Sequence, residues 1–356
     1  MAGGKERVLR RRIKSVESTK KITRAMELIS ASRIVKSQQR VAAARPYSEQ
    51  ITEVIRNLAK AGAGKTHPLL SERETINKVG IVVIAADRGL AGGYNSAVIR
   101  AAERKLKEHQ AQGRDYSLIL VGKKASDYFR FRGYRVDELF TGMTDQPRYE
   151  DARQVAEAVM TRFNEGDLDL VELAYTQFLS LGTQTVRVRR FVPIEAAAIT
   201  EDTHASGDTL QADYEYEPDP DAILDKLLPR YAEARLFAAM LDASASEHAA
   251  RQRAMKSATD NAEELIKVVA RQMNRARQES ITNEIMEIVG GAEAMGADKS
   301  SLDEVVITDT IPLSEEGRRC KKIRQLSVAF LFAETIRRIS DGESVTSLFA
   351  EQNNNF

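Results

Sequence analysis

The sequence predicts an α/β protein with two long helices, an α/β domain inserted between them, and a further α/β-type segment after the second helix. Two breaker-poor stretches predict the long helices. Arg230 to Val289 contains neither Pro nor Gly, and Lys5 to about Ala61 is interrupted only by Pro46. Strands alternating with helices between these stretches predict the inserted domain. The expected segments are 1–61, 75–199, 200–222, 223–294 and 298–356.

The longer stretch lies between Pro229 and Gly290. Its apolar and alanine positions recur at three-four spacing and form one narrow seam rather than a broad core face. These positions are Ala258, Ala262, Leu265, Val269 and Ala276. A continuous helix here would extend for roughly 90 Å, which is too long to be buried in one ordinary domain. The helix should therefore protrude and pack against a second long helix.

The N-terminal stretch is the predicted partner, with a less regular seam of the same kind. The seam residues are Leu9, Ile13, Val16, Ile22, Met26 and Ile29. Through residue 45 this stretch holds thirteen Lys and Arg against three Glu, a local excess of +10. Three interpretations fit such a helix: a solvated face, a nucleic-acid or membrane patch, or a surface for an acidic protein. The charges ring the helix and no aromatic residues are interleaved, which disfavours nucleic acid.

Between the long helices the pattern is that of an open, mostly parallel, Rossmann-like sheet. Val79 to Ala86 is a continuous apolar run typical of a strand buried on both faces. A glycine-rich turn follows, and then strands and helices alternate. Strands are expected at 118–121, 134–140, 170–178 and 185–192, and helices at 96–112, 124–132 and 150–164.

Two stretches invite an enzymatic interpretation. Gly64-Lys65-Thr66 resembles the end of a phosphate loop, but Ala59 stands where that motif needs its first glycine, and the stretch follows a helix. The loop from Asp87 to Asn95 has the right context for a dinucleotide fold but lacks the glycine spacing and the acidic residue after the second strand. We interpret it as a tight turn that binds no nucleotide.

No cofactor, metal site or catalytic group is predicted. The four histidines are scattered and form no ligand pair, and no nucleophile can be matched with a base from spacing. With 356 residues, 42% hydrophobic and 29% charged, the chain can bury a core, and its net charge of +1 argues against binding polyanions by bulk charge. Without a signal peptide or an eighteen-residue apolar run, and with Cys320 alone, the chain is expected to be soluble in a reducing cytoplasm.

Five motifs, in order along the chain, closely resemble the gamma subunit of the rotary ATP synthase over about residues 5–294. They are the stretches 21–33 (KITRAMELISASR), 86–95 (ADRGLAGGYN), 215–220 (EYEPDP), 255–261 (MKSATDN) and 277–285 (RQESITNEI). The resemblance implies that the terminal helices form an antiparallel coiled coil inside a ring of alpha and beta subunits. The α/β domain would sit at the foot of this shaft, against the epsilon subunit and the membrane c-ring.

The resemblance also implies partner contacts for particular residues. Beta-subunit contacts fall on Lys21, Arg24, Met26, Arg251, Arg277, Gln278, Thr282 and Glu284, and contacts of the foot on Tyr214, Tyr216 and Glu217. The expected function is that of a non-catalytic central-stalk rotor, coupling proton flow to ATP synthesis without a substrate or nucleic acid of its own. The actinobacterial style of the chain implies a peripheral position on the cytoplasmic face of the bacterial plasma membrane.

The end of the chain does not fit this family and resembles the C-terminal end of ribose-phosphate pyrophosphokinase over about residues 301–349. Strands are expected within 302–313 and 322–328, and a helix at 330–339. The loops for ribose phosphate and ATP that the activity needs are missing, so the tail is interpreted as a catalytically empty fragment, joined by gene fusion or by design. Its unpaired strand edges predict weak order or self-association. The alternative for the whole chain, a structural or nucleic-acid-binding coiled coil, predicts tight, steeply salt-dependent binding to DNA.

Overall fold

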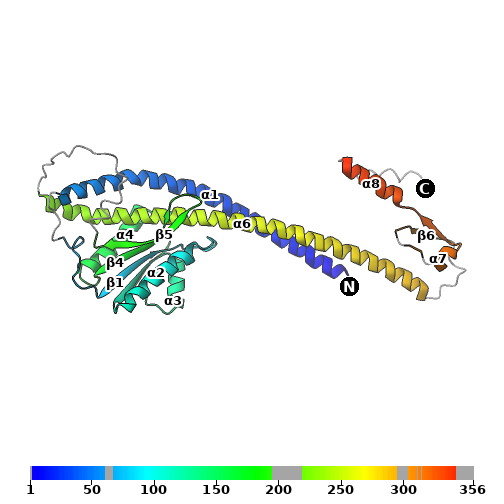
Figure 1. The fold of residues 1–356 in the computed structure, drawn as a ribbon, viewed down its shortest axis with the longest axis horizontal. Coiled ribbons are helices and arrows are strands. Elements are labelled where there is room, and N and C mark those ends of the chain that lie inside the picture. Colours follow the sequence, from blue (N-terminus) through cyan, green and yellow to red (C-terminus); the bar gives the residue numbers. More distant parts are fainter. Residues whose placement is uncertain are drawn as a thin grey trace. The chain divides into compact units, whose positions relative to one another are not determined.

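The computed structural model describes residues 2–60, 67–194, 219–294, 304–310, 312–313 and 315–341 (Figure 1). The chain divides into two compact units. One comprises Arg7–Met273, and the other comprises Met1–Glu6 with Asn274–Phe356. The predicted fold class is confirmed, because a long N-terminal helix and a long C-terminal helix accompany a largely parallel sheet.

The two long helices are α1 (Ala2–Lys60) and α6 (Pro220–Ala294). Within Arg7–Met273 they lie side by side and run in opposite directions (Figure 1). The Lys20 ammonium lies 3.1 Å from the Glu263 carboxylate, and the hydroxyl oxygens of Thr23 and Thr259 are 2.8 Å apart. Because the partner number falls in α6 as the residue number rises in α1, the pairing is antiparallel.

The seam of α1 differs from the one predicted. Ile22 and Ile29 were expected in the seam but are 61% and 54% exposed. The buried positions are polar ones at three-four spacing, namely Thr23, Glu27, Ser30 and Ser37, together with Ile34. Small hydroxyl side chains let the helices approach closely and bond to each other, as Thr23 and Thr259 do. Leu9, Ile13, Val16 and Met26 are half-buried as predicted, so the seam departs from the prediction at Ile22 and Ile29, which point outward.

The seam of α6 agrees with the prediction at Ala262, Val269 and Ala276, which are buried. It departs from the prediction at Leu265, which is 38% exposed, while the next residue, Ile266, is half-buried. Thr259, three residues before Ala262, is also buried in the seam. A seam that alternates spacings of three and four is typical of a two-helix coiled coil.

Both prolines expected to interrupt the helices lie inside them. Pro46 lies within α1 and Pro229 within α6. Proline removes one backbone hydrogen bond, and here packing compensates. Ile51, Ile55 and Leu58 after Pro46, and Leu224, Leu228 and Tyr231 around Pro229, are all buried in one core with the α/β domain. Tertiary burial thus overrides local propensity.

The inserted domain is a five-stranded sheet of order β3-β2-β1-β4-β5. The first four strands are parallel and β5 is antiparallel to β4. The strands are β1 (Lys78–Ile84), β2 (Asp115–Val121), β3 (Glu138–Phe140), β4 (Leu170–Phe178) and β5 (Gln184–Val192). The connecting helices are α2 (Tyr94–Ala111), α3 (Lys123–Phe131) and α4 (Tyr149–Asn164). The third strand is shorter than the predicted 134–140.

Helices cover both faces of the sheet, which explains the continuous apolar run of β1. On one face, Ile81 and Val83 pack with Ala102 and Leu106 of α2 and with Phe129 of α3. On the other face, Val82 and Ile84 pack with α4 and with the ends of α1 and α6 that flank the domain. The long helices are therefore anchored in the core of the domain.

The other unit contains the tail. Strands β6 (Val305–Thr308) and β7 (Ile323–Leu326) pair in parallel, and helices α7 (Glu315–Arg319) and α8 (Ala329–Asp341) accompany them. The predicted order of strand, strand and helix is present. The side chains of Phe330, Phe332 and Ile336 on α8 are largely exposed, as is Val306 on β6.

Candidate interaction surfaces

The glycine-rich loop after β1 joins the sheet to α6. The Asp87 carboxylate accepts hydrogen bonds from the Gly142 N–H at 2.9 Å, the Thr144 hydroxyl at 2.9 Å and the Lys123 N–H at 3.1 Å. These bonds tie together the segments that follow β1, β2 and β3. Gly122 approaches the loop so closely, at φ +104°, that a Cβ there would lie 2.1 Å from the Ala85 carbonyl oxygen. The Asp87 carboxylate thus holds together the loops that follow these three strands.

Arg251 of α6 contacts the same glycine-rich loop. It was predicted as a beta-subunit contact, yet the residue is only 7% exposed. Its guanidinium forms an ion pair with Glu247 and donates a hydrogen bond to the Gly89 carbonyl oxygen at 3.4 Å. Burial raises the pKa of Glu247 to about 7, although the Arg251 charge opposes the shift. In this chain Arg251 is therefore engaged internally.

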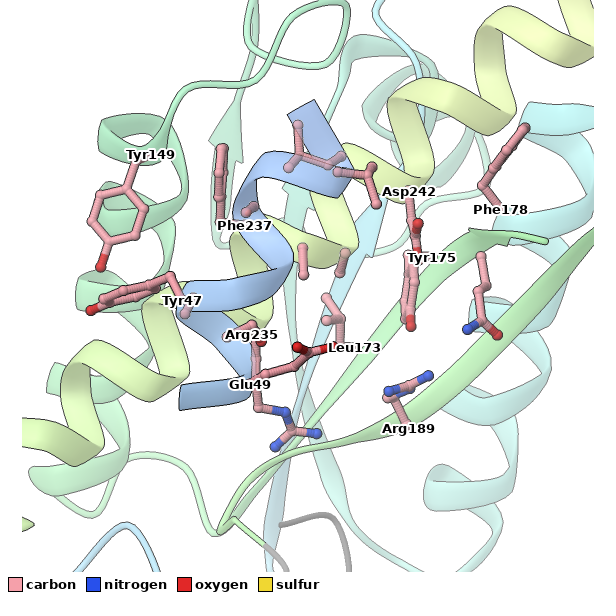
Figure 2. Close-up of a pocket in the computed structure, with 18 of the residues that line it drawn as sticks. Tyr47, Glu49, Tyr149, Leu173, Tyr175, Phe178, Arg189, Arg235, Phe237 and Asp242 are labelled. Carbon is pink, nitrogen blue, oxygen red and sulfur yellow. The ribbon is translucent and has the colours of Figure 1, made fainter. Parts of the chain in front are cut away.

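A cleft of about 820 Å³ lies between α1, α6 and strands β4 and β5 (Figure 2). Tyr47 of α1, Tyr149 of α4 and Phe237 of α6 line one side of it. The cations of its lining are bonded within the chain, since Arg189 lies over the Tyr175 ring and Arg190 pairs with Glu72. The described lining residues include neither histidine nor cysteine, and the cleft offers no arrangement of nucleophile and base.

The predicted contacts on α1 lie on its outer surface. Lys21 and Arg24 are exposed, and Met26 is half-buried. The Arg24 guanidinium donates to both carboxylate oxygens of Glu27, at 3.0 and 2.9 Å, which fixes its position beside the seam. Four apolar residues of α1 that were not predicted as contacts are also exposed: Ile22, Leu28, Ile29 and Val35. Their exposure could have been predicted from the sequence only if the face of α1 that contacts α6 had been known.

The predicted contacts near the end of α6 are also exposed. Arg277, Gln278, Thr282 and Glu284 all lie on the surface, and the Ser280 hydroxyl donates to Glu284 at 3.3 Å. Apolar side chains are exposed among them and were not predicted as contacts: Ile281 (50%), Ile285 (49%), Met286 (62%) and Val289 (51%). This end of α6 therefore presents charged and apolar groups together, a combination that marks protein interfaces.

Some predicted residues lie outside the described part of the chain. These are Tyr214, Tyr216 and Glu217 of the foot, most of the linker 200–222, and Gly64-Lys65-Thr66. Among the described residues, no cluster of three or more His, Cys, Asp or Glu side chains is placed to hold a metal ion. The same part of the chain contains no helix with the length and apolarity needed to cross a bilayer.

Comparison with known proteins decides the family. The ATP synthase family model matches residues 5–295. An ATP synthase gamma chain from Frankia casuarinae is 50% identical over 298 residues, covering 83% of this chain and 99% of its own length. The chain belongs to the ATP synthase gamma family. A gamma chain from Streptomyces avermitilis is 44% identical over 297 residues, covering 82% and 97%.

Solved structures share the gamma-family fold at low sequence identity. The rotor of the Euglena gracilis mitochondrial ATP synthase superposes with a TM-score of 0.54 at 16% identity, covering 78% of this chain and 99% of that one. The resemblance predicted from the sequence is confirmed. As a gamma chain, the protein is a central-stalk rotor subunit of ATP synthase, peripheral to the membrane and not itself catalytic.

The second resemblance is confirmed as well. The phosphoribosyl synthetase-associated domain matches residues 258–350, so it begins earlier than the predicted residue 301 and overlaps the gamma-family match. The curated gamma chains cover about four fifths of this chain, for example 83% for the Frankia relative. The tail thus carries the features of a different family.

Proposed function

We propose that this gamma chain turns inside a ring of alpha and beta subunits through two contact surfaces on its long helices. One is the basic α1 surface, formed by Lys21, Arg24 and Met26. The other is the α6 tip, formed by Arg277, Gln278, Thr282 and Glu284 with the apolar residues among them. The supporting observation is that all of these side chains are exposed or half-exposed while the seam that joins α1 to α6 is buried.

The basic α1 surface suits an acidic segment of a beta subunit. The first forty-five residues carry an excess of +10, and Lys21 and Arg24 are exposed within this region. Complementary charges speed the association of two protein surfaces and fix how they align. Exposed ion pairs, however, contribute little to the net affinity. Contacts of this kind form and break readily, which a turning shaft requires.

The α6 tip fits a surrounding ring of subunits whose inner surface is apolar and carries a few polar loops. Ile281, Ile285 and Met286 expose apolar surface that a surrounding ring would shield from water. Arg277 and Glu284 add charges of opposite sign that polar loops of a beta subunit would bind. The tip would thus be centred by burial and held at particular angles by hydrogen bonds.

The remaining partners follow from the rotor role. A proton crossing the membrane releases roughly 2.3 kcal/mol per 100 mV, so several must be summed before one ATP is made. A stiff shaft made of two helices can transmit the energy of several protons from the membrane to the site of ATP synthesis. We assign the c-ring and epsilon subunit to the foot, with Tyr214, Tyr216 and Glu217 as its contacts, and place the complex on the cytoplasmic face of the bacterial plasma membrane.

Breaking the shaft tests this proposal. Leu265→Pro removes a backbone hydrogen bond in the middle of α6 and costs roughly 3 kcal/mol or more of helix stability. We expect ATP-driven proton pumping in inverted membrane vesicles to be lost while the variant still copurifies with alpha and beta subunits. Leu265→Ala is the control, since this side chain is partly exposed and alanine favours helix. Intact pumping by the proline variant would refute a rotating shaft.

A further inference from the structure

The two helices that cover the outer face of the sheet carry an excess of positive charge. α2 and α3 pack on the face opposite the long helices (Figure 1). Together with Arg132, which follows α3, they hold eight Lys and Arg against three carboxylates. Each carboxylate is already engaged. The ion pairs are Glu103 with Lys107 and Arg132, Glu108 with Lys105, and Asp127 with Lys124.

Three arginines of these helices remain without an acidic partner. Within the described part of the chain, no carboxylate forms an ion pair with Arg100, Arg104 or Arg130, and all three residues are exposed. Arg100 and Arg104 lie one turn apart on α2, so their side chains share one side of that helix. Their charge is therefore available to an anionic partner.

The contacts of Glu103 bring the cations of α2 and α3 together. Its carboxylate pairs with Lys107 at 3.2 Å and with Arg132 at 3.3 Å, and it accepts a hydrogen bond from the Tyr128 hydroxyl at 2.8 Å. The bond to Glu103 raises the pKa of Tyr128, and the charges of Arg132 and Arg100 oppose that shift. Both guanidinium groups therefore lie near the same ring, and the cations of the two helices form one surface.

One large apolar side chain lies among these cations. Phe131, the last residue of α3, is 89% exposed, more than any other large apolar residue of the described chain. A single ring is far smaller than a stable protein interface, which buries about 800 Å² on each side. An exposed aromatic ring surrounded by cations instead suits the headgroup layer of an anionic membrane. We call this surface the basic outer face, formed by Arg100, Arg104, Lys107, Arg130, Phe131 and Arg132.

Phe131 lies at the end of the sheet where the strands begin. Arg135, four residues later, donates a hydrogen bond to the Tyr116 carbonyl oxygen at 2.6 Å, and Tyr116 is the second residue of β2. The basic outer face therefore adjoins the amino ends of the strands.

The same end of the domain is where α6 begins. Arg235, early in α6, contacts the carbonyl oxygen of Arg190, which is opposite Glu172 near the start of β4. Ser246, further along α6, donates to the Thr176 carbonyl near the end of β4. α6 thus passes the domain from the amino to the carboxyl ends of the strands before it continues with α1 toward its tip. Because the proposed rotor directs that tip into the ring, the opposite end of the domain faces the membrane.

We propose that the basic outer face binds the surface of a membrane that contains anionic lipids, with the Phe131 ring among the headgroups and the arginines at the phosphates. This inference rests on the proposed function, because the rotor role decides which end of the domain faces the membrane. Each cation near an anionic surface strengthens binding about fivefold, and guanidinium groups match phosphate oxygens. Because lipids are fluid, such a contact holds the domain near the membrane and still lets it turn.

The chain contains no tryptophan, so Phe131→Trp introduces a fluorescent reporter at this site alone. The purified full-length variant is mixed with vesicles made of equal parts of phosphatidylcholine and phosphatidylglycerol. We expect its emission maximum to move to shorter wavelength and quenching by iodide to fall, because the ring leaves water. Vesicles of phosphatidylcholine alone should leave the spectrum unchanged.

Leu179→Trp is the matched control, since Leu179 is 54% exposed and follows β4 at the other end of the sheet. Its spectrum should not change with either kind of vesicle, even if the basic α1 helix or the tail also meets the vesicles. The control therefore separates insertion at Phe131 from attachment elsewhere on the chain.

The charges are tested in the Phe131→Trp background by Arg100→Gln, Arg104→Gln and Arg130→Gln together. Vesicle affinity should fall about a hundredfold. The melting temperature should stay the same, because these arginines have no ion pair to lose within the described residues.

An unchanged spectrum with anionic vesicles, an equal change in Leu179→Trp, or undiminished affinity after the three substitutions would overturn the proposal. A spectral change caused by purified alpha and beta subunits but not by vesicles would identify a protein contact and would also overturn it. The rotor proposal has its own measurement, proton pumping by the Leu265→Pro variant, so the failure of one proposal is distinguished from the failure of the other.

Discussion

At the scale of single residues, Glu103 shows how the outer helices of the domain are joined. It lies on α2, is 7% exposed, and accepts hydrogen bonds from the hydroxyls of Tyr128 at 2.8 Å and Tyr134 at 3.0 Å. Lys107 and Arg132 form ion pairs with the same carboxylate. Burial alone would raise the pKa of Glu103, but bonds from Tyr128, Lys107 and Tyr134 lower it to about 2.

This pKa predicts a pH dependence of stability. Because the folded-state pKa lies below the unfolded value of 4.5, the stabilisation is complete above about pH 4.5. It is lost as the pH falls through the folded value near 2. The loss amounts to at most about 3 kcal/mol. Urea denaturation between pH 6 and 2.5 should therefore show the free-energy gap between the unmodified chain and Glu103→Gln closing as the pH falls. Parallel curves would show that Glu103 is not ionised in the network.

Residue positions were predictable from sequence only where a local rule fixes them. The exposure of Lys21 and Arg277 follows from charge alone. The burial of Arg251 does not, because its partner Gly89 lies 162 residues away in the chain. The outward position of Ile22 and Ile29 was missed for a related reason. Two large apolar residues are normally placed in a seam, and only the contact of Thr23 with Thr259 shows that small hydroxyl residues occupy it here.

At the scale of elements, periodicity predicted nearly every helix and strand of the α/β domain. Strand β4 has the predicted bounds, 170–178, and α4 begins one residue before its prediction. The long helices also agree with the predicted segments, 1–61 and 223–294, to within three residues at each end. Pro46 and Pro229 are stop signals in a sequence, yet both lie in helices whose neighbouring turns are buried against the domain. Burial of apolar side chains stabilises each of these helical turns by more than the backbone hydrogen bond that proline removes.

The basic α1 surface yields a prediction at this scale. Reversing both charges with Lys21→Glu and Arg24→Glu should leave assembly with alpha and beta subunits intact, because the seam residues are unchanged and Glu27 loses only its ion pair with Arg24. Coupling should become inefficient, since like charges would now meet an acidic beta segment. The measurement is the ratio of proton pumping to ATP hydrolysis in membrane vesicles, expected to fall several-fold at low salt and to recover partly at high salt.

A single charge reversal on the domain shows whether losing positive charge elsewhere on the chain has the same effect. Arg153 is exposed on α4, away from both long-helix surfaces. Arg153→Glu should leave the coupling ratio unchanged. If it lowers coupling as much as reversal at Lys21 and Arg24, or if that reversal has no effect at any salt concentration, α1 makes no electrostatic contact with the ring.

At the scale of the whole molecule, the chain joins two kinds of structure. The gamma-family match ends at residue 295, and the tail carries a two-stranded parallel sheet. Parallel sheets are normally covered on both faces, and two strands alone are marginal in water. Here Val306 is 51% exposed and Leu326 44%, while Phe330 and Phe332 of α8 are 79% and 56% exposed. The tail therefore exposes the kind of surface that causes proteins to associate.

Truncation after Ala297 tests what this surface does. The full chain should sediment with a weight-average mass that rises with concentration, and the truncated chain should sediment as a monomer at all concentrations. Full-length Phe330→Ser with Phe332→Ser removes apolar surface but keeps the length, so it should behave like the truncated chain if burial of α8 drives association. Both shortened and full chains should assemble with alpha and beta subunits and give equal ATPase activity, since the contact residues proposed for the rotor precede residue 290. Identical sedimentation of all three proteins would show that the exposed strands and helix of the tail do not associate.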